Sequence, residues 1–271
     1  MTGGLFDKYF HSIGSLGRMV SSRMKSIDYS SSPYSIPSRY AEAHQRYWDR
    51  LAAPGSWLTG EERIAIAREV RQVASCKLCQ ERKKALSPYQ VDGAHETVSD
   101  LDDLIIEVVH RIISDPGRLT KTWYEGLMQQ GLTPGKYIET LGTLGCVFTI
   151  DEFCRGLDIP LNELPEPQAG DPSQYRPDNI LDDGDGAWVP ILPNVVDSGP
   201  ESDLWQDRTG YVIRALSLVP DEVRHMLDLL DVHYMNNNEI WNVTGSRRGT
   251  LSRMQMEVVA ARVSALNGCF Y

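Results

Sequence analysis

Apolar residues recur every three to four positions through most of the chain, which is the pattern of amphipathic α-helices. Pro and Gly interrupt this pattern at the points where helices are expected to end. No segment alternates polar and apolar residues for long enough to require a strand. The sequence therefore predicts an all-α fold, with helices in the first half at 40–52, 59–75, 76–86, 98–115, 118–130 and 133–156.

The pattern changes after residue 160, where Pro, Gly and Asp become frequent. This composition is typical of a linker or an extended segment. Helical patterning resumes near residue 203 and continues toward the C-terminus. We therefore divide the chain into a leader or extra helix at 1–36, a first helical domain at 37–165, a linker at 166–188 and part of a second helical domain at 189–271.

The helix predicted at 59–75 is similar to the last segment of the chain. Leu58 lies 18 residues before Cys76, and Leu251 lies 18 residues before Cys269. A Thr or Ser that can cap a helix follows each leucine. The apolar positions also correspond in pairs: Ile66 with Val259, Ala67 with Ala260, Val70 with Val263, and Val73 with Leu266. A shared cap, apolar stripe and cysteine indicate a duplicated unit.

Net charge, the length of apolar runs and the cysteine count exclude some classes of function. A formal net charge of -10 and a pI of about 5.1 offer no basic surface to nucleic acid. No apolar run reaches the ~18 residues that cross a bilayer. The odd number of cysteines, and an N-terminal segment that does not read as a cleavable secretory signal, favour a reducing compartment. We therefore expect a cytoplasmic protein that binds neither nucleic acid nor membrane.

Cys76 and Cys79 form a Cys-x-x-Cys pair at the predicted start of the helix 76–86. Two residues three apart on a helix share a face, so their sulfurs can meet. The helix dipole and the unpaired N–H groups of the first turn lower the pKa of the first thiol. The pair is a candidate redox-active dithiol, and we expect no cofactor.

Two other interpretations of the pair stay open. A zinc site would need two further ligands, and the sequence has no second closely spaced Cys/His pair. His95 could join the two cysteines, whereas Cys146 and Cys154 lie on an apolar helix and are expected in the core. The pair could also be inert.

The Cys-containing segments resemble the alkylhydroperoxidase D-like, or carboxymuconolactone decarboxylase, superfamily in its peroxidase-related branch. The family signature is a glutamate, eleven residues, Cys-x-x-Cys, three residues and a histidine. Glu257 stands at the glutamate position before Cys269, and the surrounding segment is similar to the motif helix of the family. The resemblance covers about residues 40–180 and 188–271. It implies two alkylhydroperoxidase-like helical units in tandem, the second of them incomplete.

The resemblance also implies an activity, that of a thiol-dependent peroxidase or disulfide reductase. In the family, glutamate and histidine relay protons to the cysteine nearer the C-terminus, which attacks peroxide while the other cysteine resolves it. By analogy Cys79 attacks and Cys76 resolves, and Glu257 and Cys269 are the matching site residues of the second unit. A small peroxide substrate, a thiol electron donor and self-association follow from the same resemblance.

The first unit departs from the signature. Ile64 occupies the glutamate position and Lys83 the histidine position, while Glu61 and Glu62 lie about one turn earlier. We therefore expect the first unit to lack the relay and to turn over peroxide slowly. Two alternative functions remain: a catalytically degenerate helical scaffold, and an enzyme of the carboxymuconolactone-decarboxylase type, a branch that generally lacks the cysteine pair.

The second unit stops at Tyr271, one residue before the position that matches Cys79. We expect that the sequence is a truncated reading of a longer protein. A UGA codon read as a stop would make the missing residue a selenocysteine, and a frameshift or a nonsense codon would give the same sequence. In either case the apolar stripe of Val259, Val263 and Leu266 is expected to be only partly covered.

Overall fold

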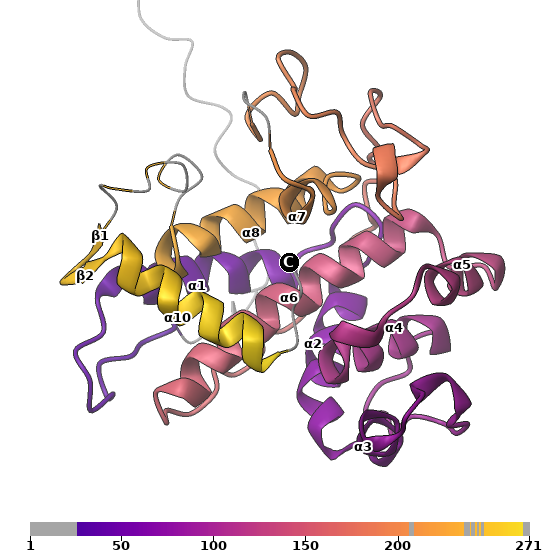
Figure 1. Cartoon of the computed structure of the whole chain (residues 1–271), viewed down its shortest axis with the longest axis horizontal. Helices are drawn as coiled ribbons and strands as arrows, with labels where there is room; N and C mark the ends of the chain where they lie inside the picture. Colours follow the sequence, from indigo (N-terminus) through magenta and orange to yellow (C-terminus); the bar gives the residue numbers. More distant parts are fainter. Residues whose placement is uncertain are drawn as a thin grey trace, which may run out of the picture.

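The computed structural model describes residues 26–205, 209–235, 239, 242, 244 and 247–267 (Figure 1). This part of the chain is mostly helical, which confirms the all-α prediction. Its strands are limited to a short antiparallel hairpin of β1 (Arg247–Arg248) and β2 (Leu251–Ser252). Among these residues no helix combines the length and apolarity that are needed to cross a bilayer.

The six helices predicted for the first half are present. Their bounds are α1 (Ser38–Ala52), α2 (Gly60–Gln72), α3 (Lys77–Lys84), α4 (Asp103–Ser114), α5 (Lys121–Gln129) and α6 (Pro134–Gly156). The first turn of α2 is fixed by a capping box, in which Thr59 and Glu62 bond each other's backbone N–H groups. The α4 helix starts later than the predicted 98, because the side chain of Asp102 accepts a hydrogen bond from the N–H of Leu104 and caps the helix there.

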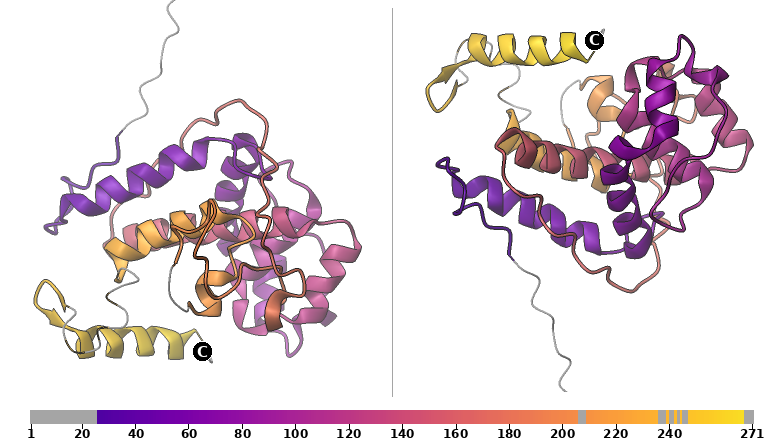
Figure 2. Two further views of the ribbon diagram at one scale, coloured as in Figure 1. Left: turned by 90° about the horizontal axis from the view of Figure 1, so that it is seen from above. Right: turned by 90° about the horizontal axis from the view of Figure 1, so that it is seen from below.

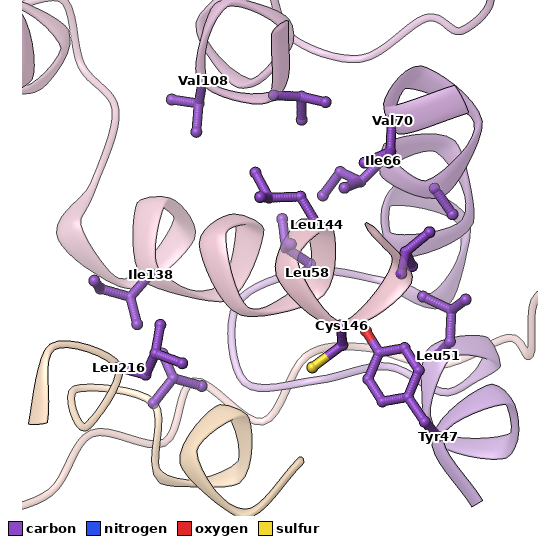
Figure 3. Close-up of a cluster of buried hydrophobic side chains, with 14 of the residues drawn as sticks. Tyr47, Leu51, Leu58, Ile66, Val70, Val108, Ile138, Leu144, Cys146 and Leu216 are labelled. Atoms are coloured by element: carbon purple, nitrogen blue, oxygen red, sulfur yellow. The ribbon is translucent and has the colours of Figure 1, made fainter. Parts of the chain in front are cut away.

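The helices α2, α4 and α6 pack against one another, and α1 contacts α2 and α6. The helix α8 (Pro220–His233) packs on α1 and α6 (Figures 1 and 2). Figure 3 shows the core around α6, where Tyr47 and Leu51 of α1, Ile66 and Val70 of α2, and Leu144 of α6 meet. A single apolar core therefore joins the first six helices to α8.

Residues between α6 and α7 (Tyr211–Arg214) form no α-helix in the part that the structure describes, although η4 (Gly184–Gly186) is a single 3-10 turn. The backbone of this segment nevertheless bonds to the loop between α1 and α2. The N–H groups of Gln168, Ser173 and Gln174 donate to carbonyl oxygens of that loop and of the end of α1. Ile191 and Leu192 are fully buried. The segment is thus irregular in secondary structure, but it is held against the helical core by hydrogen bonds and buried side chains.

The last helix, α10 (Arg253–Leu266), lies at the edge of the molecule (Figure 2). Ser252 and Gln255 form a capping box at its start, as Thr59 does in α2. The stripe of Val259, Val263 and Leu266 is 51–67% exposed, whereas the corresponding Ile66, Val70 and Val73 are buried. The two segments therefore share a cap and an apolar pattern, but this pattern is buried in the first segment and exposed in the second.

Candidate functional site

The Cys-x-x-Cys pair lies at the start of α3, as the sequence predicts. The α2 helix ends in a 3-10 turn, η1 (Val73–Ser75), and Cys76 is the extended N-cap residue of α3. Cys79 lies in the first turn. Both are free thiols, and they are 0% and 2% exposed, respectively. The turn between the two helices thus buries both sulfurs beneath the protein surface.

Two histidines from different segments complete the group. His95 lies in the loop that follows α3, and its Nδ1 is 3.6 Å from the Sγ of both Cys76 and Cys79. His110 lies on α4, and its Nδ1 is 3.3 Å from the Sγ of Cys79. The four ligand atoms all lie within 4.8 Å of one another. The structure therefore brings two histidines to the cysteine pair, and these are the two further ligands that a zinc site would need.

A buried carboxylate of α2 orients His110. The Nε2 of His110 lies 3.1 Å from the carboxylate of Glu69, and both side chains are fully buried. Glu69 is itself held by the N–H of Val98 and the hydroxyl of Ser99. Burial lowers the pKa of His110, although Glu69 acts in the opposite direction. The ring is therefore neutral at pH 7.

A second carboxylate orients His95 in the same way. The Nε2 of His95 lies 2.8 Å from Glu107 of α4, which also accepts hydrogen bonds from Arg82 and from the indole of Trp123. Burial would raise the pKa of Glu107, but the bonds from His95 and Arg82 outweigh it and lower this pKa to about 2. Burial opposes protonation of His95, yet its contacts with Glu107 and Cys76 raise the pKa of the ring.

These contacts fix the tautomer of each ring. A carboxylate only accepts hydrogen bonds, so each Nε2 must carry the proton that it donates. In a neutral imidazole the other nitrogen then has a free lone pair. The Nδ1 of His110 therefore directs a lone pair at the sulfur of Cys79, and the Nδ1 of His95 does so at both sulfurs when that ring is neutral. Each lone pair can accept a thiol proton or bind a metal ion.

The two thiols differ in acidity. Burial disfavours the Cys76 thiolate, but the backbone N–H groups of Cys79 and Glu96 and the ring of His95 outweigh burial and lower the pKa of Cys76. Burial and the neighbouring Cys76 raise the pKa of Cys79 to about 12. Ionisation of Cys79 thus requires a base, and the neutral ring of His110 is in contact with it.

A cavity of about 460 Å³, partly open to solvent, lies beside Cys79. Its walls come from α2, α3, α4 and α6 and include Lys83, Ser114 and Phe148. Cys76 is not among the lining residues. A small molecule that entered this cavity would meet Cys79 first.

Among the residues that the structure describes, no other sequence-predicted site residue joins this group. Glu257 lies on α10, where its carboxylate bonds the hydroxyl of Tyr234 and pairs with Arg253. Cys269 lies outside the described residues. Glu62 is occupied at the start of α2, where it caps the helix and contacts Lys136.

The residues at the glutamate and histidine positions of the family signature also lie outside the group of two cysteines and two histidines. Ile64 is a core residue, and Lys83 lines the cavity. The signature positions of the first unit therefore supply no relay. His110, which comes from another position, stands beside Cys79 instead, and Glu69 contacts the far side of its ring.

Three of the site residues were missed by the sequence reasoning: Glu69, Glu107 and His110. A signal exists for the two residues of α4, because Glu107 and His110 interrupt an otherwise apolar run. Glu69 lies between Arg68 and Val70 and gives no such signal. Titratable side chains are seldom fully buried without a partner. A buried carboxylate and a buried histidine on two packed helices are therefore candidates for a pair.

Comparisons of the chain with protein-family models, with curated proteins and with solved structures found no match. The function proposed below therefore rests on the geometry of the site and on the resemblance in the Cys-containing segments.

Proposed function

We propose that the protein is a thiol-dependent peroxidase or disulfide reductase in which Cys79 attacks the substrate and Cys76 resolves the product. The observation that carries this proposal is the chain of contacts from the Cys79 sulfur to His110 at 3.3 Å and on to Glu69 at 3.1 Å. A nucleophile, a base and a group that orients the base are the parts that covalent catalysis requires.

The first step would be proton transfer from Cys79 to the Nδ1 of His110. The thiolate then attacks the terminal oxygen of a hydroperoxide, and the O–O bond breaks. Cys79 becomes a sulfenic acid, and the alkoxide that leaves takes the proton from His110 to form an alcohol. Glu69 stabilises the charged imidazole between these two transfers, because its carboxylate lies against the Nε2 proton.

The second step would close the disulfide. The Cys76 thiol passes its proton to His95, and the thiolate attacks the sulfur of the sulfenic acid. The S–O bond breaks, and the leaving hydroxide takes that proton to form water. The two sulfurs lie within 4.8 Å of each other, so modest side-chain rotation brings them to the ~2.05 Å of a disulfide bond. The lowered pKa of Cys76 supports this role.

The proposal includes the partners that such a cycle requires. A small peroxide fits the cavity beside Cys79, and an external dithiol returns the two electrons by thiol–disulfide exchange. The resemblance to the alkylhydroperoxidase D-like superfamily supports the same cycle and adds self-association. A reducing compartment such as the cytoplasm suits free thiols.

Peroxide consumption by reduced protein, measured with a chelator present, tests the proposal. We expect one equivalent of peroxide to lower the titre of the five thiols by two, and dithiothreitol to restore them. The Cys79→Ser variant should consume no peroxide. The His110→Gln variant should react about 10²-fold or more slowly, since general-base catalysis contributes about 10²–10⁴-fold.

The matched control is Cys146→Ser, which removes another buried thiol, on α6, outside the site. This variant should consume peroxide at the rate of the unmodified protein. Equal rates in the Cys79→Ser variant and the unmodified protein, or failure of Cys79 to react with an alkylating agent in the native state, would refute the redox function.

A further inference from the structure

We propose that the reduced protein binds one zinc ion through Cys76, Cys79, His95 and His110. Four ligand atoms, two sulfurs and two imidazole nitrogens, converge within 4.8 Å of one another. This donor set is that of a structural zinc site of the Cys2His2 type. The spacing Cys-x2-Cys-x15-His-x14-His brings the ligands from three segments of the chain, so the site depends on the fold.

Three sulfur–nitrogen distances in the group fit tetrahedral coordination. Zinc–sulfur bonds of about 2.3 Å and zinc–nitrogen bonds of about 2.05 Å place tetrahedral ligands about 3.5 Å apart for a sulfur–nitrogen pair. The three sulfur–nitrogen contacts measured here are 3.6, 3.6 and 3.3 Å. An ion could therefore enter with only small side-chain movements.

The groups behind the ligands point to the same conclusion. Histidines that bind zinc usually donate the other ring N–H to a carboxylate, which fixes the tautomer and raises the basicity of the ligating nitrogen. Here both rings do so, His110 to Glu69 and His95 to Glu107. The two carboxylate–histidine pairs thus present both ring nitrogens to the cysteine sulfurs, His95 to Cys76 and Cys79 and His110 to Cys79.

Zinc is favoured over other divalent metals by the donor set. Two thiolates and two imidazoles in a tetrahedron suit zinc, whereas magnesium, calcium and manganese prefer oxygen ligands. The side chains of Cys76, Cys79 and His110 are at most 2% exposed. A buried ion with four protein ligands has no open position for water, so we infer a structural ion.

A structural ion would fasten the loop between α3 and α4. This loop supplies His95 and also Glu96, whose carboxylate accepts a hydrogen bond from the N–H of Lys77 at the start of α3. Coordination would join the loop, the first turn of α3 and the middle of α4 at one point. The zinc-bound protein should therefore resist proteolysis in residues 85–102 better than the metal-free protein.

The metal and the disulfide exclude each other. Zinc displaces the protons of both thiols and holds the sulfurs as thiolates. Oxidation to a disulfide removes two of the four ligands and would release the ion. This consequence rests on the proposed redox function, whereas the zinc site itself rests on the four ligands alone.

Metal titration of the full chain, reduced and treated with a chelator, tests the site. We expect binding of one zinc ion per chain. Cobalt in place of zinc should give the visible bands of a tetrahedral ion and a near-ultraviolet charge-transfer band from thiolate. The Glu69→Gln variant should weaken zinc binding by about 10- to 100-fold, and Cys76→Ser should weaken it further and reduce the charge-transfer band.

The Cys146→Ser variant is the control, and it should bind zinc as the unmodified protein does. Circular dichroism of each variant without metal shows whether that variant folds. If Cys76→Ser does not fold, the zinc affinity of Glu69→Gln decides the outcome. Absence of stoichiometric zinc, no thiolate band with cobalt, or equal zinc affinity in the Cys76→Ser variant would overturn the proposal.

The two proposals can fail separately. Zinc binding by a protein whose metal-free form never forms the Cys76–Cys79 disulfide would support the zinc site and refute the redox function. Disulfide formation by a protein that does not bind zinc would support the redox function and refute the zinc site.

Discussion

The buried guanidinium of Arg63 gives the sharpest test of how α2, α6 and α8 pack together. It extends from α2 and lies 3.2 Å from a carboxylate oxygen of Glu139 on α6 and 3.3 Å from one of Glu222 on α8. Both carboxylates are fully buried, and the arginine side chain is 3% exposed. We predict that Arg63→Met, which keeps much of the volume and removes the charge, destabilises the fold.

The magnitude follows from the two carboxylates that the substitution leaves behind. Removing one partner from a buried ion pair costs about 3–5 kcal/mol, because the remaining charge stays uncompensated. Burial already raises the pKa of Glu139 to about 7 in the presence of Arg63. Burial also opposes ionisation of Glu222, where His225 and Arg63 outweigh it and lower the pKa. Without Arg63, both carboxyl pKa values should rise.

The sign of the pH dependence is fixed by these shifts. Carboxyl groups whose pKa is higher in the folded protein than in the unfolded chain bind protons preferentially in the folded state, so stability decreases as pH rises. The free-energy loss in Arg63→Met should therefore be larger at pH 8 than at pH 5, by up to about 1.4 kcal/mol per pH unit for each carboxyl that stays protonated.

Urea unfolding followed by circular dichroism at both pH values measures this loss. The matched control is Arg68→Met, which removes an exposed arginine from the same helix and should change the free energy of unfolding by less than about 0.5 kcal/mol. A loss below about 1 kcal/mol for Arg63→Met that is the same at pH 5 and pH 8 would show that the guanidinium does not compensate these carboxylates.

Two further predictions concern the packing of α8 against α1 and against α6. The rings of His44 and His233 stack with their Nε2 atoms 2.8 Å apart, and burial lowers their pKa values to about 3 and about 4 from 6.5. Because both rings stay neutral in the folded state, the free energy of unfolding should fall as pH drops from about 6.5 toward 4, by about 1.4 kcal/mol per pH unit for each ring. The His233→Gln variant should show a smaller slope. Urea unfolding at several pH values measures it. At Gly142 an added Cβ would lie 2.6 Å from the Cβ of Glu222, so Gly142→Ala should cost about 1–3 kcal/mol. Gly145→Ala, where nothing lies within 4 Å, should gain about 0.5–1 kcal/mol in the same measurement; equal effects of the two substitutions would contradict the close approach of α6 and α8.

Local patterns in the sequence were sufficient for the helices and for the cysteine pair. The period of apolar residues and the capping residues Thr59 and Ser252 depend on neighbours within one turn, and so does the meeting of Cys76 and Cys79. The convergence of His110 on these sulfurs depends instead on how α4 crosses α2 and α3. No spacing in the sequence encodes that crossing, so a buried histidine in an apolar helix indicates a partner without identifying it.

The carboxylate of Glu222 has a consequence for how the chain can be divided. The irregular, Pro-rich segment after α6 marks a natural place to cut when only the sequence is considered. In the folded molecule, however, α8 closes the other side of α6 and contributes one of the two anions that surround Arg63. A fragment that ended before α8 would open this charged cluster and the adjoining apolar face to water. The helices on both sides of the segment thus share one apolar core and one buried ion-pair cluster, and a cut in this flexible-looking sequence would separate groups that pack together.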